Sequence, residues 1–404
     1  MPQLPHNSYP RRPINVLLLV VAAILLLLAL TGTDLAPLHN DFVEYWSAAH
    51  LLLSGRDPYS PAAMLQVELA TGFQGKQALL MWNPPWALPF VLPLGLLSYS
   101  HASSLWLLLS LIVVFASADW LWRAYGGDPK RRWLAWLLAA TFFPLLAAMG
   151  LGQIGPLILL GITLFLRFHR SRPLLAGAAT VLIAVKPQLL FLFWIVLLLQ
   201  GLCGVWIPLA GAALGLGLLG ALPLLLSHSI WSSYLHLARG GTVLRYPSPT
   251  FGTLLRAWLG DKAWLQFVPP LIGTVWAVLF WTRRRRRWSW QLELPLLLLV
   301  SLVTTAYGWL FDQIVLLPAM MQVAVPLARC RRRLWVSSLA GYAAASAVMV
   351  LFLIWRKTGT AYTWTAPAWL LMYLSIRSRI VRESSCRDTA RSISAAQPGV
   401  GSEN

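Results

Sequence analysis

The chain has 404 residues, of which 58% are hydrophobic and only 11% are charged, and its formal net charge is +19. Leucine-rich runs recur from Val16 to Leu374, and about 20 consecutive apolar residues span the roughly 30 Å hydrocarbon core of a bilayer. Backbone polar groups in lipid must be satisfied internally, so such runs are helices. A buried core helix explains one such run but not a series of them, and the sequence therefore predicts an all-α integral membrane protein.

The positive charge does not indicate a nucleic-acid partner. The basic residues form short clusters between apolar segments, at Lys130 to Arg132, Arg283 to Arg287 and Arg329 to Arg333, which is the positive-inside pattern of membrane proteins. A continuous basic groove with base-stacking aromatics is missing. The three cysteines give neither a disulfide framework nor a metal-binding spacing, so the sequence identifies no metal site.

About twelve membrane helices are expected from the hydrophobic runs. The first run could be a signal peptide, but it has no small-x-small cleavage site and many helices follow it, so we interpret it as a retained helix. The helices form one polytopic domain over 15–377, between a cytoplasmic N-terminus (1–14) and a polar cytoplasmic tail (378–404) that is expected to be disordered. They cover 15–33, 101–122, 133–150, 155–168, 173–186, 188–203, 205–227, 263–282, 291–309, 314–328, 334–355 and 362–377.

The distribution of basic residues orients the chain. With both ends in the cytoplasm, most of the 32 Lys and Arg residues fall on the cytoplasmic side, as the positive-inside rule requires. Long external loops then cover residues 34–100 and 228–262. Residues 83–98 hold prolines at positions 84, 85, 89 and 93, and a full span there would turn the next basic clusters outward. We therefore expect this segment to be broken and re-entrant or interfacial.

A candidate for chemistry lies at the start of the first external loop, in the stretch NDFVEYWSAAHLLLSGRDPY over residues 40–59. If residues 42–53 form a helix, Asp41, Tyr45 and, more loosely, Glu44 share one face, because residues three and four apart are neighbours. A carboxylate beside a membrane can act as a general base towards a hydroxyl nucleophile. The alternative is that the acid simply caps this helix, and the local residues leave both interpretations open.

Two further polar sites interrupt apolar runs on the external side. Lys186 and Gln188 stand in VKPQ, and an ionisable group at membrane depth is a functional candidate because its burial is costly. The alternative is a lysine that snorkels to the interface. Asp312 lies in AYGWLFDQIVLLP, which also contains Tyr307. Asp312 can bind a substrate hydroxyl, pair with Lys186 or an external arginine, or cap the next helix, and the sequence does not decide among the three.

Three more segments carry candidate substrate contacts. Asn83 lies in WNPPW, whose tryptophans suit either sugar stacking or the membrane interface. Gln153 lies in GLGQIGP, where the glycines allow a tight turn and the amide can hydrogen-bond a ligand. His236, Arg245 and Arg256 occupy the second external loop and can hold a phosphate or a sugar. Anchoring at the interface is the favoured explanation of WNPPW, and a plain turn explains GLGQIGP as well as a ligand contact does.

The order of these motifs resembles that of glycosyltransferase family 87. The resemblance rests on Asp-Phe-x-x-Tyr-x-x-Ala followed by LLLSGRDPY, then NPPW, GQ, KPQ and YGWLFDQIVLLP, and extends over roughly residues 16–372. No HExxH, GxSxG, Walker A or GxGxxG motif stands in a usable context, so protease, hydrolase and nucleotide-motor functions have no support. The resemblance implies a GT-C fold with a long first external loop.

The same resemblance implies an activity. Enzymes of this kind transfer a hexose, with mannose as the best guess, from a polyprenyl-phosphate-linked donor. The implied catalytic acid is Asp41, acting as a general base with inversion at the sugar carbon while polyprenyl phosphate leaves. The implied contacts are Lys186, Arg245 and Arg256 for the donor phosphate, and Gln153, Gln188 and Asp312 for the sugar or the acceptor.

The expected partners are the lipid-linked donor, a glycolipid or glycan acceptor and membrane lipids, without a cofactor. The basic loops fit a multi-pass protein of a bacterial plasma membrane. An active site on its extracytoplasmic side has no access to nucleotide sugars, so a lipid-linked donor is the consistent choice. The alternatives are a transporter or flippase of a lipid-linked sugar and a structural membrane subunit. A transporter is expected to place polar residues near mid-membrane on several helices, whereas here they gather at external helix ends.

Overall fold

The computed structural model describes residues 41–241, 246–328, 332–357 and 359–396, and these residues form helices and no strand. The expected all-α class is therefore confirmed, while the expected first helix, 15–33, lies outside the described residues. Contacts divide the chain into two compact units. Unit 1 contains residues 41–81, 88–113 and 149–153 of the described chain, and unit 2 contains residues 82–87, 114–148 and those from 154 onwards.

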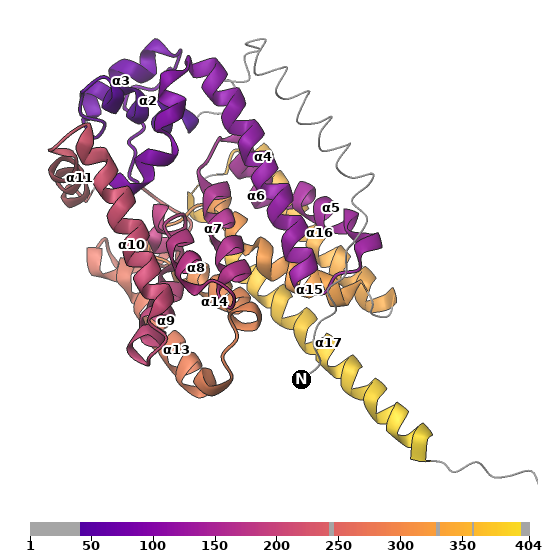
Figure 1. Ribbon diagram of the computed structural model, residues 1–404. Helices are drawn as coiled ribbons and strands as arrows, with labels where there is room; N and C mark the ends of the chain where they lie inside the picture. The colour runs from indigo at the N-terminus through magenta and orange to yellow at the C-terminus, as the bar shows by residue number, and fades with distance from the viewer. Residues whose placement is uncertain (1–40, 242–245, 329–331, 358, 397–404) are drawn as a thin grey trace, which may run out of the picture. The chain divides into compact units, whose positions relative to one another are not determined.

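Unit 1 is built around helix α2 (Figure 1), most of whose residues are buried. Phe42 of α2 stacks on Tyr99 and Trp106, with ring centroids 6.0 and 5.7 Å away. A Cβ atom on Gly95 would lie 2.9 Å from Ala49 of α2, so a glycine is required for this close approach. The elements of the unit are α2 (Phe42–Leu53), α3 (Pro61–Ala70), the 3-10 helix η3 (Leu92–Leu96) and the first part of α4 (Tyr99–Ala124).

The proline-rich segment after Met81 is not a regular helix. It forms two short 3-10 helices, η2 (Pro85–Phe90) and η3, separated at Val91. Proline lacks an N–H group and its ring crowds the preceding turn, so four prolines prevent a continuous α-helix. The prediction that residues 83–98 form a broken segment is therefore confirmed. Its re-entrant or interfacial position stays a prediction.

Unit 2 contains most of the helices. In chain order, its α-helices are α5 (Trp133–Thr141), α6 (Phe143–Gly150, whose end belongs to unit 1), α7 (Gly155–Phe168), α8 (Pro173–Ala179), α9 (Phe191–Leu202), α10 (Ile207–Ala221), α11 (Ile230–Arg239), α12 (Phe251–Leu259), α13 (Val268–Arg284), α14 (Trp290–Thr304), α15 (Leu317–Leu327), α16 (Arg332–Ile354) and α17 (Thr365–Ala396). The last helix extends into residues 378–396, where the sequence predicts the cytoplasmic tail, and residues 397–404 lie outside the described chain.

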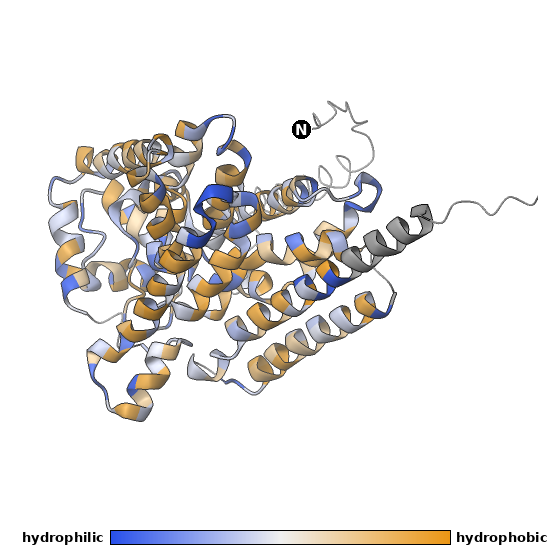
Figure 2. Ribbon diagram, turned by 90° about the horizontal axis from the view of Figure 1, so that it is seen from below, coloured by the Kyte–Doolittle hydropathy of each residue, from blue (hydrophilic) through white to orange (hydrophobic). Residues whose placement is uncertain are grey.

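Five described helices are long and apolar enough to cross a membrane, and the number rises to seven if each of two bent helix pairs is one span. Apolar residues cover much of the long helices (Figure 2), and in α16 only 6% of the most apolar window is buried inside the protein. Side chains that are apolar but exposed in this way suit contact with lipid. The chain is thus a membrane protein, and the full number of twelve helices stays a prediction.

Two of the expected helices are bent or shortened where prolines fall. The expected helix 133–150 consists of α5 and α6, bent by 59°, and Pro144 lies in the first turn of α6. The expected helix 173–186 is α-helical only to Ala179. It continues in 3-10 turns up to Lys186, and the pair bends by 120° at the break before Pro187. In both places proline removes a backbone donor and crowds the carbonyl four residues earlier.

Helices α8 and α10 lie side by side in unit 2 (Figure 1), in the most extensive helix contact of the described chain. A Cβ atom added to Gly177 would lie 1.9 Å from the backbone oxygen of Pro208, and one added to Gly211 would lie 2.1 Å from that of Leu174. Small residues let membrane helices approach backbone to backbone and gain van der Waals contact. The glycines therefore set the distance between these two helices.

We expect Gly177→Ala to lower the free energy of unfolding by about 1–3 kcal/mol, because overpacking forces the helix backbones apart. The measurement is thermal unfolding of the purified protein in a neutral detergent. The matched control is Gly217→Ala in α10, where an added Cβ atom has no neighbour within 4 Å and alanine favours the helix. Equal stability of the two variants would contradict the role of Gly177.

Candidate functional site

Asp41 occupies the N-cap position of α2, but its carboxylate does not cap the helix. Its backbone N–H group donates to the carbonyl of Leu151 at 3.1 Å, and its Oδ2 atom accepts a hydrogen bond of 2.6 Å from Nε2 of Gln153. The side chain is half-buried. Asp41 thus occupies the position of a capping residue. Its carboxylate, however, bonds to Gln153 in the segment 149–153 and not to the first turn of α2.

Gln153 connects Asp41 to Tyr45 within unit 1. The amide oxygen of Gln153 accepts from the Tyr45 hydroxyl at 3.1 Å, while its NH₂ group donates to Asp41. Both Tyr45 and Gln153 are buried, and Trp106 fixes the same turn by donating to the carbonyl of Gly152 at 2.9 Å. The amide is thus oriented from both ends and holds the carboxylate in a defined direction. Glu44 lies half-buried in the first turn of α2.

A second polar cluster forms in unit 2, at the break between η5 (Ile183–Val185) and η6 (Pro187–Leu190). Carbonyl groups on both sides of the break accept hydrogen bonds from side chains, as backbone in an apolar environment requires. Trp86 donates to Ala184 and Asn83 to Val185, each at 2.9 Å, while Thr305 donates to Gln188 at 2.9 Å and Ser301 to Leu189 at 2.8 Å. The WNPPW motif and the end of α14 therefore hold the bend in place.

Lys186 lies at the bend and forms an ion pair with Asp312, with 2.8 Å between Nζ and Oδ1. The side chain of Asp312 is only 2% exposed and that of Lys186 is 14% exposed. The second oxygen of Asp312 accepts the backbone N–H of Trp309 at 2.9 Å, at the start of η11 (Leu310–Leu316). Asp312 thus combines two of the three roles that the sequence leaves open, the pair with Lys186 and the helix start.

Aromatic side chains surround this ion pair. Nζ of Lys186 lies 5.1 Å from the centroid of the Phe311 ring, a distance at which a cation is attracted to the ring face. The indole N–H of Trp309 donates to the Tyr307 hydroxyl at 2.8 Å. The cluster therefore presents a cation, a phenol and apolar rings within a few residues of the helix break. These are groups that suit an anionic, amphiphilic ligand.

Three predicted contacts remain, all in the second predicted external loop. Arg256 is held by Asp261, with 2.7 Å between Nε and Oδ1, and by the amide oxygen of Gln266 at 3.4 Å. Gln266 is buried and donates to the carbonyl of Ala306. His236 is exposed on α11, and Arg245 lies outside the described residues.

Sequence reasoning missed the donors that hold the helix break. The sequence suggests sugar stacking or interface anchoring for the tryptophans of WNPPW, not the hydrogen bond that Trp86 makes at the break. Ser301 and Thr305 are not among the candidate residues, although a signal exists for both. Ser301 and Thr305 are four residues apart at the end of an apolar helix, which places both on one face, and hydroxyl groups in membrane helices commonly bond to neighbouring backbone. Among the described residues, no group of three His, Cys, Asp or Glu side chains is arranged to hold a metal ion.

Glu68 of α3 is a buried carboxyl group in unit 1. Its Oε2 atom accepts the backbone N–H of Leu79 at 3.1 Å, and its Oε1 atom has no hydrogen-bond partner among the described residues. Burial raises the pKa of Glu68 from 4.5 to about 7, against the opposing effect of the hydrogen bond from Leu79. The folded chain therefore keeps this proton at a pH where an exposed glutamate has lost it.

We expect the stability of unit 1 to fall as the pH rises from about 4.5 to 7. In this window the folded chain binds the Glu68 proton and the unfolded chain does not, so stability decreases with pH and levels off above the folded-state pKa. Thermal unfolding at several pH values tests this. Glu68→Gln keeps the neutral form and should flatten the dependence, and an unchanged pH profile in that variant would contradict the assignment.

We expect Asp312→Asn to destabilise unit 2 by about 3 kcal/mol, because it leaves a largely buried ammonium without its counter-charge. Lys186→Met in the same chain should recover part of the loss. Denaturant or thermal unfolding of the three variants measures the coupling between the two side chains. The control is Asp261→Asn, which breaks the pair with Arg256 at an aspartate that is 79% exposed and should cost less than about 1 kcal/mol.

Residues 82–312 match glycosyltransferase family 87. The matched region begins after Asp41, Glu44 and Tyr45, so the cluster around Asp41 extends beyond it. No curated protein and no solved structure matches the chain. The other predicted site residues fall inside the matched region: Asn83, Gln153, Lys186, Gln188, His236, Arg245, Arg256, Tyr307 and Asp312. Since the match covers more than half of the 404 residues, the chain belongs to glycosyltransferase family 87 and is a membrane glycosyltransferase.

Proposed function

We propose that the protein transfers a hexose, with mannose as the first choice, from a polyprenyl-phosphate donor to a glycolipid or glycan acceptor outside the cytoplasm. The bias of Lys and Arg supports an extracytoplasmic position of residues 34–100, on a side where nucleotide sugars are absent. A polyprenyl donor is amphiphilic, so its chain can stay in lipid while its phosphosugar meets a polar pocket at the surface. Membership of the family supports sugar transfer as the reaction.

The observation that carries the catalytic assignment is the hydrogen bond between Gln153 and the Asp41 carboxylate. In the proposed step, Asp41 removes the proton of the acceptor hydroxyl as its oxygen attacks the anomeric carbon. The bond between this carbon and the phosphate oxygen breaks, polyprenyl phosphate leaves, and the configuration is inverted. A general base must be oriented towards the proton that it takes, and the amide of Gln153, fixed by Tyr45, supplies that orientation.

We propose Lys186 as the contact for the donor phosphate. A partly buried ammonium group at a helix break can stabilise the negative charge that develops on a leaving phosphate. Arg256 is the second candidate, and its guanidinium group is likewise engaged within the protein, by Asp261 and Gln266. Gln188, Tyr307, His236, Glu44 and Arg245 stay predicted sugar or phosphate contacts. Asn83 and Asp312 have structural partners that account for their positions, and any substrate role would be additional.

We expect Asp41→Asn to lower the rate of transfer by about 10²–10⁴-fold, the usual contribution of a general base. The purified protein is incubated with polyprenyl-phosphate-mannose or other polyprenyl-phosphate hexoses and a lipid or glycan acceptor, and the release of polyprenyl phosphate is measured. Asp41 makes no capping hydrogen bond, and the side-chain oxygen of asparagine can still accept from Gln153, so the variant should unfold at nearly the wild-type temperature.

Asp57→Asn is the matched control for this experiment. Asp57 lies in the same predicted loop and accepts the backbone N–H of Tyr59 at 2.9 Å through one oxygen, which an amide oxygen can replace, so activity should be retained. Full activity of Asp41→Asn would exclude Asp41 as the base. If the wild type releases no polyprenyl phosphate but moves a labelled lipid-linked sugar across vesicles, the flippase alternative is correct.

A further inference from the structure

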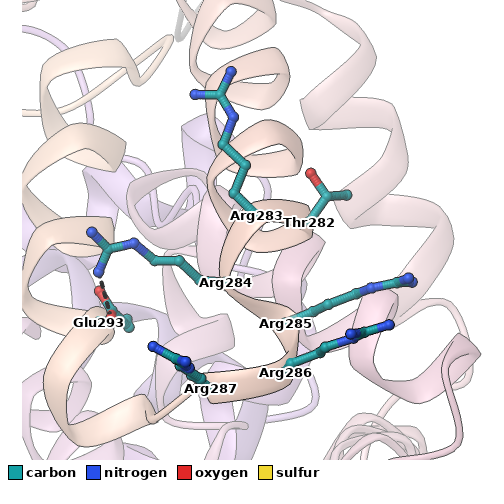
Figure 3. A pocket seen from close by; sticks show the side chains of 7 residues that line it. All are labelled: Thr282, Arg283, Arg284, Arg285, Arg286, Arg287 and Glu293. Carbon is teal, nitrogen blue, oxygen red and sulfur yellow. Dashed lines mark hydrogen bonds and ion pairs between the residues drawn. The ribbon is translucent and has the colours of Figure 1, made fainter.

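Five consecutive arginines, Arg283 to Arg287, occupy the end of α13 and the short 3-10 helix η10 (Arg285–Arg287) that follows it. Together with Thr282 and Glu293 they line an open hollow of about 660 Å³ (Figure 3). Arg284 turns towards Glu293 and forms an ion pair of 2.7 Å with it, whereas Arg285 and Arg286 extend in the opposite direction. Among the described residues, only Arg284 of the five has a carboxylate partner.

The local environment does not neutralise this charge. Arginine stays protonated at any physiological pH, so the hollow is lined by five positive charges and the single carboxylate of Glu293. The C-terminal end of α13 favours cations through its helix dipole, but this effect is worth less than about 1 kcal/mol for each exposed charge. Guanidinium groups bind phosphate through paired N–H donors, and a phosphate group therefore complements the hollow in charge and in chemistry.

An apolar face of α13 leads directly to the hollow. Leu271, Val275 and Leu279 are 65%, 53% and 49% exposed, and their spacing of four residues puts them in one row along the helix. Arg283 is the next member of this row. Residues 263–287 are apolar and long enough to cross a membrane, so in a bilayer the row contacts acyl chains and its arginine end reaches the level of the headgroups.

Aromatic residues near the arginines support a position of the hollow at the level of the lipid headgroups. The Arg284 guanidinium lies 4.9 Å from the ring centroid of Phe280, and Trp288 contacts the same ring edge to face, with centroids 5.8 Å apart. Tryptophan is enriched at the interface between lipid and water. The hollow itself is lined by guanidinium groups, and the apolar row and these aromatic rings lie next to it in the sequence of α13 and the following turn.

We propose that this hollow is a binding site for an anionic phospholipid, whose phosphate lies among the arginines and whose acyl chains lie along Leu271, Val275 and Leu279. A free phosphate ion contacts the arginines alone, whereas one phospholipid contacts the arginines and the adjoining apolar row together, and this continuity favours the lipid. The positive-inside rule assigns the site to the cytoplasmic leaflet, on the opposite side from the proposed chemistry. The inference does not depend on the identity of the transferred sugar.

The test uses the full-length protein, purified in a neutral detergent and titrated with phosphatidylglycerol, with phosphatidylcholine of the same acyl chains or with inorganic phosphate. Bound lipid is counted by native mass spectrometry. We expect saturable binding of phosphatidylglycerol and much weaker binding of the other two. Arg283→Gln with Arg286→Gln removes two charges, keeps the pair between Arg284 and Glu293, and should weaken phosphatidylglycerol binding about tenfold.

The matched control is Arg379→Gln with Arg382→Gln, which removes the same charge from exposed positions of α17 and should leave lipid binding within about twofold of the wild type. Equal losses in both double variants would show a diffuse charge effect and overturn the site. Binding of inorganic phosphate as tight as that of phosphatidylglycerol would overturn the lipid assignment. The comparison of lipids on the wild-type protein needs no substitution. Equal binding of phosphatidylglycerol and phosphatidylcholine there would overturn the site even if a variant does not fold.

Discussion

Proline in an apolar helix exposes carbonyl groups that lipid cannot satisfy, and this constraint organises unit 2. At Pro187 the chain bends by 120°, and four side chains donate to the carbonyls on either side of the bend. Two of these donors come from WNPPW and two from the end of α14. Removing any one of these donors leaves a buried carbonyl without its hydrogen bond, which costs about 1–3 kcal/mol. The four hydrogen bonds therefore hold WNPPW and the end of α14 against the break.

The break also explains why a lysine is tolerated in an apolar stretch. A regular helix would carry Lys186 on a surface of apolar neighbours, whereas the turn at Pro187 directs its ammonium to Asp312. Asp312 in turn is fixed by the N–H group of Trp309. Discontinuous helices with ionisable groups recur at ligand sites of membrane proteins because they bring backbone and charge to the same place. The polar cluster is therefore a consequence of the fold and not an addition to it.

Much of the fold was predictable from the sequence, because apolar runs and proline positions are local signals. The helical class and the broken segment after Met81 follow from residues close in sequence. The partners of the site residues do not, since Gln153 lies 112 residues from Asp41 and Asn83 lies 102 residues from Val185. No periodicity connects positions so far apart, so both amides were predicted as substrate contacts, and their bonds to the protein required the structure.

The two aspartates of the candidate site are held in different ways. Asp312 uses both of its carboxylate oxygens within unit 2, one for the ammonium group of Lys186 and the other for the backbone N–H group of Trp309. The Asp41 carboxylate accepts a hydrogen bond from the amide of Gln153, whose oxygen accepts in turn from the Tyr45 hydroxyl. A general base must be oriented towards the proton that it takes, and an amide that is fixed at both ends can supply this orientation. This contact, more than the presence of acids near the membrane, is therefore the reason to propose Asp41 as the base.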